Sequence, residues 1–266
     1  MISAQKNDRM RVKLMMRPTM EEAKKLLEED PFGAESWYAY GVAVGYEKGP
    51  EEAVDAFSEG LIHNPFDADL YFGRGRKQNN AGRFRSALSD FTMSIRLEPY
   101  AWCHWYYRAT TYNLNGFYKE SIDDFMSCLK YSEEYERCPM VHWIYTTALD
   151  TGEREKAEEA LGWFGDDVKP PQMDYGYHRC VLLYKGILTP ETFVDIPDME
   201  KNCLKQPDRI NLELNTMYSG PYPFHMFRGP EQEADDARRK LREIAIPNSF
   251  GYMRGSVAAK KRGLLK

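Results

Sequence analysis

The chain has 266 residues, more than one compact core usually holds, so we expect either two domains or an elongated array of repeats. Hydrophobic residues make up 42% and charged residues 29%, which excludes an intrinsically disordered chain. Lys and Arg total 36 and Asp and Glu total 41, so the formal charge is 36 − 41 = −5, which argues against a protein that coats nucleic acid.

Residues 1–18, MISAQKNDRMRVKLMMRP, have no apolar core of signal-peptide length, and we treat them as an N-terminal tail. No run in the sequence approaches the ~18 apolar residues that a membrane-spanning helix needs. We therefore expect no membrane contact and a cytoplasmic location.

A period of 34 residues begins after this tail. A spacing of 34 residues separates Pro31, Pro65 and Pro99. The same spacing separates Trp37, Tyr71 and Trp105. A fixed period of this length indicates stacked units of supersecondary structure. We number three units from Ala34, Ala68 and Trp102.

Four positions of each unit repeat in residue type. Position 4 holds Trp37, Tyr71 and Trp105, position 8 holds Gly41, Gly75 and Ala109, position 20 holds Ala53, Ala87 and Ser121, and position 24 holds Phe57, Phe91 and Phe125. Positions 4 and 8 share one side of a helix, and positions 20 and 24 form the facing stripe of a second helix. Gly49, Gly82 and Gly116 lie where a turn needs a left-handed residue. Each unit is thus predicted to be a helix, a turn and a second helix that ends before a proline.

This pattern resembles the tetratricopeptide repeat, with a large residue at position 4, small residues at 8 and 20, an aromatic residue at 24 and proline at 32. The resemblance implies an all-α fold, a right-handed α-α superhelix or solenoid of stacked helix-turn-helix repeats. It also implies that the first helices line a concave groove, which in such proteins binds a protein or peptide. We expect this chain to be a non-catalytic scaffold of that kind.

We assign the array to residues 19–196. Upstream of the first unit, TMEEAKKLLEEDPF resembles the second half of a repeat, and a fourth unit is recognisable from Cys138. DYGYHRCVLLYKGIL then predicts an apolar helix, and Thr189 and Pro190 predict the start of a short one.

Residues 197–266 are predicted to be a degenerate repeat or capping segment with a basic tail. The stretch YSGPYPFHMFRGP cannot be an uninterrupted helix, because proline lacks the amide proton that a helix needs. The tail MRGSVAAKKRGLLK has five basic residues and no acid, a composition more typical of a solvated terminus than of a nucleic-acid site.

The groove positions that the resemblance implies are aromatic and rich in amides, with one central arginine. The candidate peptide-binding residues are Tyr38, Val42, Phe72, Arg76, Asn79, Asn80, Tyr106, Tyr107, Thr110, Asn113 and His142. Tyr and Arg are side chains that often dominate interface energies, and Asn can pair with a peptide backbone. Two alternatives remain open: Tyr106, Tyr107 and Trp143 fill space between helices, or Arg76 is tied to Asp69 or a neighbouring acid as part of the scaffold.

The chaperone-binding members of the family hold a peptide carboxylate with Lys, Asn and Arg at set positions. At those positions this chain has Tyr38, Val42, Gly73, Cys103 and Tyr107. We therefore expect no carboxylate clamp for chaperone tails.

No motif for metal, nucleotide or nucleophilic chemistry is found, so we expect no catalytic residue, metal or cofactor. The five cysteines include no CxxC pair, which indicates reduced, mostly buried thiols. We interpret the pair Asp123 and Asp124 as surface charge, because sequence neighbours on a helix do not face one another.

Two other functions stay open. The loop of residues 218–228 gathers Tyr218, Tyr222, His225 and Arg228, so the chain could be an enzyme or a small-molecule sensor with its site there. It could also be a structural subunit whose convex face and basic tail pack in an assembly.

Overall fold

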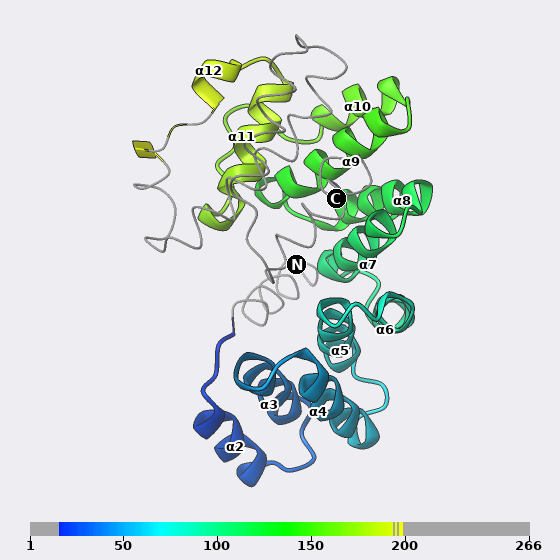
Figure 1. The fold of residues 1–266 in the computed structure, drawn as a ribbon, viewed down its shortest axis with the longest axis vertical. Coiled ribbons are helices and arrows are strands. Elements are labelled where there is room, and N and C mark those ends of the chain that lie inside the picture. The colour runs from blue at the N-terminus through cyan, green and yellow to red at the C-terminus, as the bar shows by residue number, and fades with distance from the viewer. Residues whose placement is uncertain (1–15, 194, 196, 199–266) are drawn as a thin grey trace, which may run out of the picture. The chain divides into compact units, whose positions relative to one another are not determined.

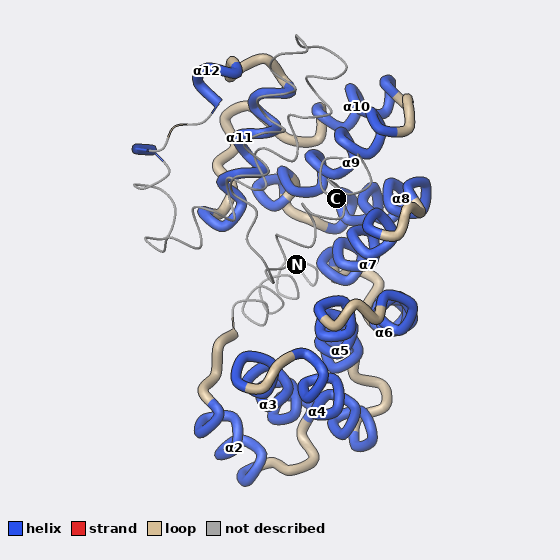
Figure 2. Tube along the Cα trace, in the orientation of Figure 1, coloured by secondary structure: helices blue, strands red, loops and turns tan. Residues whose placement is uncertain are grey.

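The computed structural model describes residues 16–193, 195 and 197–198. Every regular element in this part of the chain is a helix, and Figure 2 shows no strand among the coloured residues. The all-α prediction is confirmed there. The chain divides into two compact units, Met1–Tyr131 and Ser132–Lys266, which are described separately.

The described part of the first unit, from residue 16 on, holds one single helix followed by three helix pairs. The helices are α2 (Met20–Glu29), α3 (Ala34–Glu47), α4 (Pro50–His63), α5 (Ala68–Asn80), α6 (Phe84–Leu97), α7 (Trp102–Leu114) and α8 (Tyr118–Tyr131). Each packs on the next in sequence, and the first helices α3, α5 and α7 also contact one another in order (Figure 1). The pairs α3–α4, α5–α6 and α7–α8 are the three predicted repeats, and α2 packs on α3 as expected of a preceding half-repeat.

The second unit begins with the 3-10 turn η1 (Glu134–Glu136). It continues with α9 (Cys138–Asp150), α10 (Arg154–Leu161), the 3-10 turn η2 (Gln172–Asp174), α11 (Tyr175–Tyr184) and α12 (Pro190–Phe193). Helix α9 packs against both α10 and α11, and nearly all of its residues are buried. The predicted fourth helix pair, the apolar helix and the short helix at Pro190 are all present. The boundary between the two units falls inside the range 19–196 that the sequence assigned to one array.

The helix boundaries follow the glycines and prolines that the sequence singled out. Gly82 and Gly116 have φ angles of 74° and 83°, in the left-handed region where glycine carries no steric cost. Helix α4 ends two residues before Pro65, and α6 ends two residues before Pro99. The turn and stop signals therefore act at the predicted places.

The aromatic residue at position 4 has a polar role that the sequence pattern did not reveal. The indole Nε1 of Trp37 donates to the carbonyl of Pro31 at 2.9 Å, and that of Trp105 donates to the carbonyl of Pro99 at 2.8 Å. In the middle repeat the Tyr71 hydroxyl donates to the carbonyl of Pro65 at 3.2 Å. The shared 34-residue period of prolines and aromatic rings is thus a hydrogen bond repeated three times between a turn and the helix after it.

Close approach of the two helices in a repeat depends on the small residue at position 8. A Cβ on Gly41 would lie 2.8 Å from the Phe57 ring, and one on Gly75 would lie 2.8 Å from the Phe91 ring. Both rings are fully buried. Glycine at this position allows the phenylalanine of the second helix to pack directly on the first-helix backbone.

A buried ion pair also repeats with the 34-residue period. Arg74 donates from Nε and Nη2 to the Asp90 carboxylate, both at 2.8 Å, and from Nη1 to Ser58 Oγ in the preceding repeat at 3.2 Å. Such two-pronged pairs are stronger than single contacts between neutral groups. One arginine thereby joins its own repeat to the one before it.

The same arrangement recurs one repeat later. Arg108 binds Asp124 through two hydrogen bonds of 2.8 Å and reaches Thr92 at 3.1 Å. The interpretation of Asp124 as surface charge was wrong, because its side chain is only 8% exposed and faces Arg108. Asp123 is exposed, as expected. A helical period places only one of two adjacent carboxylates toward the neighbouring helix.

The cysteines in the described part are buried free thiols, namely Cys103, Cys128, Cys138 and Cys180; Cys203 lies outside the described residues. Burial raises the pKa of Cys128 well above its ordinary value, which keeps the thiol protonated and unreactive. Among the described residues no cluster of His, Cys, Asp and Glu could hold a metal ion. None of their helices is both long and apolar enough to cross a bilayer.

Substitution of Gly75 by leucine tests the packing at position 8. The added side chain must displace Phe91, and overpacking of this kind costs ~1 to 3 kcal/mol. Thermal melts should show a clear loss for Gly75→Leu and almost none for Lys119→Ala, an exposed control on α8. Equal melting temperatures for the two variants would contradict the packing described above.

Substitution of Asp124 by alanine tests the repeated ion pair. Loss of the acceptor leaves the partly buried Arg108 without its carboxylate and should lower the free energy of unfolding by about 1.5 to 3 kcal/mol. Asp123→Ala is the matched control, since the adjacent carboxylate is exposed, and it should change stability by less than about 0.5 kcal/mol. Urea denaturation followed by tryptophan fluorescence compares the two, and coincident transitions would show that the pair contributes nothing.

Candidate functional site

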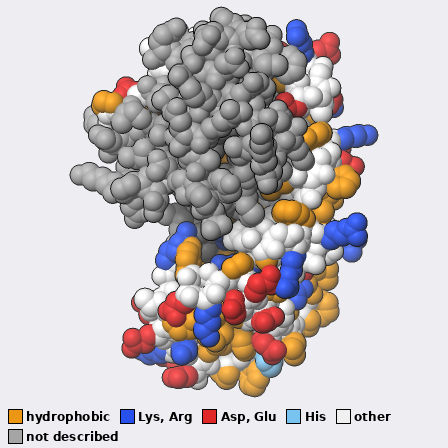
Figure 3. Space-filling view, viewed as in Figure 1, with side chains coloured by type: hydrophobic (Ala, Val, Ile, Leu, Met, Phe, Trp, Pro, Cys, Tyr) orange, Lys and Arg blue, Asp and Glu red, His pale blue; other side chains and the backbone are white. Residues whose placement is uncertain are grey.

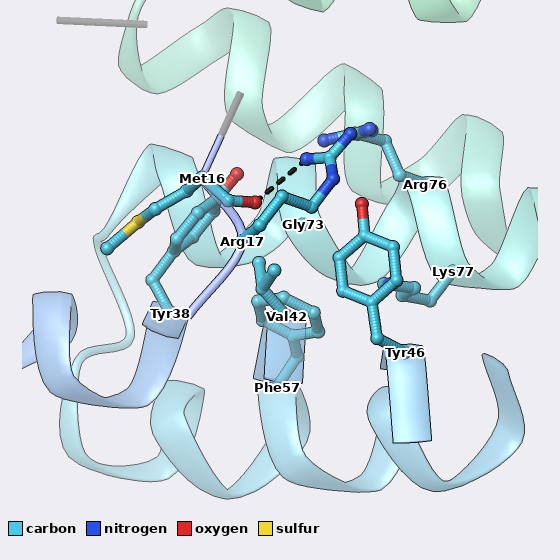
Figure 4. Close-up of a pocket in the computed structure, with 9 residues that line it drawn as sticks. All are labelled: Met16, Arg17, Tyr38, Val42, Tyr46, Phe57, Gly73, Arg76 and Lys77. Carbon is cyan, nitrogen blue, oxygen red and sulfur yellow. Dashed lines mark hydrogen bonds between the residues drawn. The ribbon is translucent and has the colours of Figure 1, made fainter. Parts of the chain in front are cut away.

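The candidate site lies in the first unit, on the side of α3, α5 and α7 that carries the predicted groove residues; we call this side the first-helix face. A small pocket of about 20 Å³ opens there, room for about one water-sized group. It is lined by Met16, Arg17, Tyr38, Val42, Tyr46, Phe57, Gly73, Arg76 and Lys77 (Figure 4). These residues come from the segment before α2 and from helices α3, α4 and α5.

The pocket exists because position 6 of the second repeat is a glycine. A Cβ on Gly73 would lie 2.5 Å from the Phe57 ring, so any side chain there would meet the ring that forms the pocket floor. The equivalent position of the third repeat is Tyr107, whose ring fills the corresponding space and packs near Phe91 at a centroid distance of 6.1 Å. One residue difference between repeats therefore leaves a hollow at one junction and fills it at the next.

Arg76 is partly buried at the edge of this pocket. Its guanidinium carbon lies 5.1 Å from the centroid of the Tyr107 ring and 5.6 Å from that of Phe72. Such stacking stabilises a guanidinium while leaving its N–H groups directed outward in the ring plane. No hydrogen bond or ion pair within the described residues involves Arg76, so the alternative that ties it to Asp69 is not observed there.

Two further cations lie beside Arg76. The Lys77 ammonium is 5.2 Å and the Arg17 guanidinium carbon 4.9 Å from the centroid of the Tyr46 ring. Burial, together with the positive charges of Arg76 and Arg17, lowers the pKa of Lys77 to about 8. Figure 4 shows the side chains of Arg17, Tyr46 and Arg76 converging on the mouth of the pocket.

The structure brings some of the predicted site residues together and uses others inside the fold. Tyr38 and Val42 line the pocket with Arg76, and Phe72 lies fully buried against the Arg76 side chain. Asn79 is buried and donates to Thr111 Oγ1 at 2.7 Å, an interaction between repeats. Asn80 is exposed at the end of α5.

The predicted residues of α7 are largely structural. Tyr106 is 8% exposed, and its ring packs edge-on against Phe125. Thr110 is buried and donates to the backbone carbonyl of Tyr107, whereas Asn113 is partly buried. The space-filling alternative thus describes Tyr106 well, while Tyr107 is also half of the platform under Arg76.

His142 belongs to the second unit. It is buried, and its Nδ1 lies 3.1 Å from the hydroxyl of Tyr184 on α11, with the two rings stacked. These contacts are within that unit, and they account for both the burial and the orientation of the ring.

Sequence reasoning missed Arg17 and Lys77. Lys77 follows Arg76 in the sequence, but its position is not among the groove positions that the family resemblance implies. Arg17 was assigned to the N-terminal tail, and nothing in its local sequence indicates that it contacts Tyr46. Only the fold brings the two cations to the same ring.

The cation cluster is local. In the space-filling view, the lower part of the molecule, which carries α2 to α4, shows acidic and basic side chains mixed with apolar ones (Figure 3). The visible part of that surface has no broad field of one sign. The concentration of positive charge at Arg17, Arg76 and Lys77 is therefore not a general feature of this visible surface.

Solved structures of other proteins have a similar fold. A tetratricopeptide repeat protein from Parabacteroides merdae aligns over 90% of this chain and 90% of that chain, with a TM-score of 0.55 and 13% identity. A chain in the crystal structure of the APC/C hetero-tetramer Cut9–Hcn1 aligns over 90% of this chain and 44% of that one, with a TM-score of 0.57 and 14% identity. The chain has a tetratricopeptide-type repeat fold. No family model and no curated protein matches the sequence.

Within this tetratricopeptide-type fold, the pocket lies at the junction of the first and second repeats. Sequence identities of 13% and 14% support a shared fold but not a shared site. The chemistry of the pocket therefore rests on this chain's own residues. Those residues combine an apolar floor, two tyrosines and three cations.

Substitution of Arg76 by glutamine tests the electrostatics of the cluster. Removal of one positive neighbour should raise the pKa of Lys77 above its value of about 8. Competitive acetylation across a pH series, read by mass spectrometry of the Lys77 peptide, measures this pKa. Exposed Lys119 in the same sample is the reference. Identical labelling curves for Lys77 in the two proteins would show that Arg76 does not act on it.

Proposed function

We propose that the chain is a non-catalytic scaffold that binds a protein or peptide on the first-helix face of its first unit. The observation that carries the proposal is the environment of the Arg76 guanidinium. Its guanidinium is held between Phe72 and Tyr107, and no described residue accepts its hydrogen bonds. A planar donor fixed on aromatic rings and facing a pocket is suited to a carboxylate or carbonyl of a partner.

The apolar surroundings support the same proposal. Tyr46 is 55% exposed although its ring lies beside the pocket, and Met16, Tyr38 and Val42 contribute apolar surface to the lining. Aromatic residues and arginine are the side chains most enriched at interface hot spots. The matched chain of the Cut9–Hcn1 structure is itself part of a hetero-tetramer, so one protein of this fold is found in a complex with another protein.

No observation on the described residues favours an enzyme. The alternative site of residues 218–228 lies outside them, as does the basic tail that the structural-subunit alternative requires. The pattern of the chaperone carboxylate clamp is missing from the sequence, so the proposed partner is not a chaperone tail held in that way. The proposed partner is a protein or peptide; we propose no nucleic acid, membrane or cofactor.

The experiment is affinity capture of the partner from the native cell, followed by calorimetric titration of wild type and Arg76→Ala. Loss of the guanidinium should weaken binding by about 2 kcal/mol or more, roughly 30-fold in Kd. The melting temperature should hardly change, because Arg76 makes no hydrogen bond or ion pair within the described residues.

Arg85→Ala is the matched control, since Arg85 is an exposed arginine on the second helix α6. It should bind the partner as wild type does. Full affinity of Arg76→Ala would move the binding site away from the first-helix face. Equal losses in both arginine variants would indicate a general effect of charge instead.

A further inference from the structure

The pocket on the first-helix face gathers three positive side chains and, among its lining residues, no carboxylate. Lys77 and Arg17 both lie about 5 Å from the centroid of the Tyr46 ring, and Arg76 directly precedes Lys77 on α5. Arg76 and Lys77 are adjacent on α5, yet both reach this pocket because each packs against an aromatic ring. Lys77 packs against Tyr46, and Arg76 packs against Tyr107. The nearby Asp69 acts on the buried hydroxyl of Tyr38 and is not a lining residue.

Like charges held this close repel one another. Groups from three parts of the chain face Lys77: Arg17 from the segment before α2, Tyr46 from α3 and Arg76 from α5 itself. Both arginines lower the pKa of the lysine, and burial does so most strongly. A bound anion would offset the repulsion and raise the pKa of Lys77 again, because it attracts all three cations at once and replaces the water that they lose.

We propose that this cation cluster binds one anionic oxygen group, a carboxylate or a phosphate, carried by the peptide that occupies the first-helix face. This inference rests on the proposed function and adds the chemistry of the partner to it. The guanidinium of Arg76 offers two parallel N–H donors to two oxygens, and Lys77 contributes a point charge beside them.

The size of the pocket favours a single small group. About 20 Å³ admits an atom or two of a carboxylate or phosphate, while the rest of that residue stays outside against the exposed ring of Tyr46. A long acidic tract is not required, since this hollow depends on Gly73, and at the next junction Tyr107 occupies the equivalent position.

The affinity of the pocket for an anion should depend on pH in a definite direction. An anion prefers protonated Lys77, so its binding raises the pKa of that group above the free value of about 8. The contribution of Lys77 to affinity is then complete below pH 8 and declines as the pH rises above it. A tenfold preference for the protonated lysine moves its pKa from about 8 to about 9.

The test measures the Lys77 pKa by competitive acetylation in the presence of defined probes. The first two are short Gly/Ser peptides, one with a central glutamate and one with a central phosphoserine. The third is the same peptide with glutamine, and the fourth is inorganic phosphate. Sodium chloride holds the ionic strength constant, because exposed charges are screened by salt. Concentrations up to about 10 mM cover dissociation constants in the millimolar range.

We expect the glutamate peptide, the phosphoserine peptide or both to raise the Lys77 pKa, and the glutamine peptide to leave it unchanged. Arg76→Gln should abolish the rise, whereas Arg85→Gln on α6 should not. Lys119 is the internal reference for effects unrelated to the pocket.

Three results would overturn the inference: no rise with any probe, an equal rise with the glutamine peptide, or a rise with inorganic phosphate alone. The last would assign the pocket to a free anion. None of them decides whether a partner binds the first-helix face, because the loss of partner affinity in Arg76→Ala is a separate measurement. Failure of the anion site and failure of the scaffold are therefore distinguishable.

Discussion

The Phe57 ring lies between the backbones of two first helices. It packs on Gly41 of its own repeat and on Gly73 of the next, and a Cβ at either glycine would come within 2.8 Å of it. One side chain thus sets the distance between the helices of the first repeat and the distance between the first and second repeats. Because Gly73 has no side chain, the same contact leaves the hollow that Tyr38, Arg76 and Lys77 surround. Both the fold and the candidate site therefore depend on the contact of the Phe57 ring with these two glycines.

The polar contacts between repeats act on top of this packing. The rings at position 4 bind the proline carbonyls of the preceding turns, and the Arg74–Asp90 and Arg108–Asp124 pairs join adjacent repeats through Ser58 and Thr92. These bonds are local and repeated, so each repeat is positioned by its neighbours alone. Arg76 of the pocket differs from these arginines, because Arg74 and Arg108 have carboxylate partners within the fold and Arg76 has none among the described residues.

The sequence predicted the helices well and the site only in part. The period of 34 residues located the helices α3 to α8, since proline, glycine and position-specific small residues act through short-range sterics. Arg76 and Tyr107 were predicted from the family pattern, but Lys77 and Arg17 were not, because their meeting at Tyr46 depends on contacts between distant segments. Asp124 was misjudged for a similar reason: adjacent carboxylates look alike in sequence, and only the packing of α8 on α7 shows which one is buried.

Site-specific photo-crosslinking in the native cell tests most directly whether the first-helix face is the binding surface. A photoreactive phenylalanine derivative would replace Tyr46 in one variant and Phe117 in another; Phe117 is 51% exposed and precedes the second helix α8. The account predicts a defined crosslinked protein from position 46 only, its attachment point next to an acidic or phosphorylated residue, and loss of the crosslink when Arg76 is also changed to alanine. A defined crosslink from position 117 with none from position 46 would contradict it.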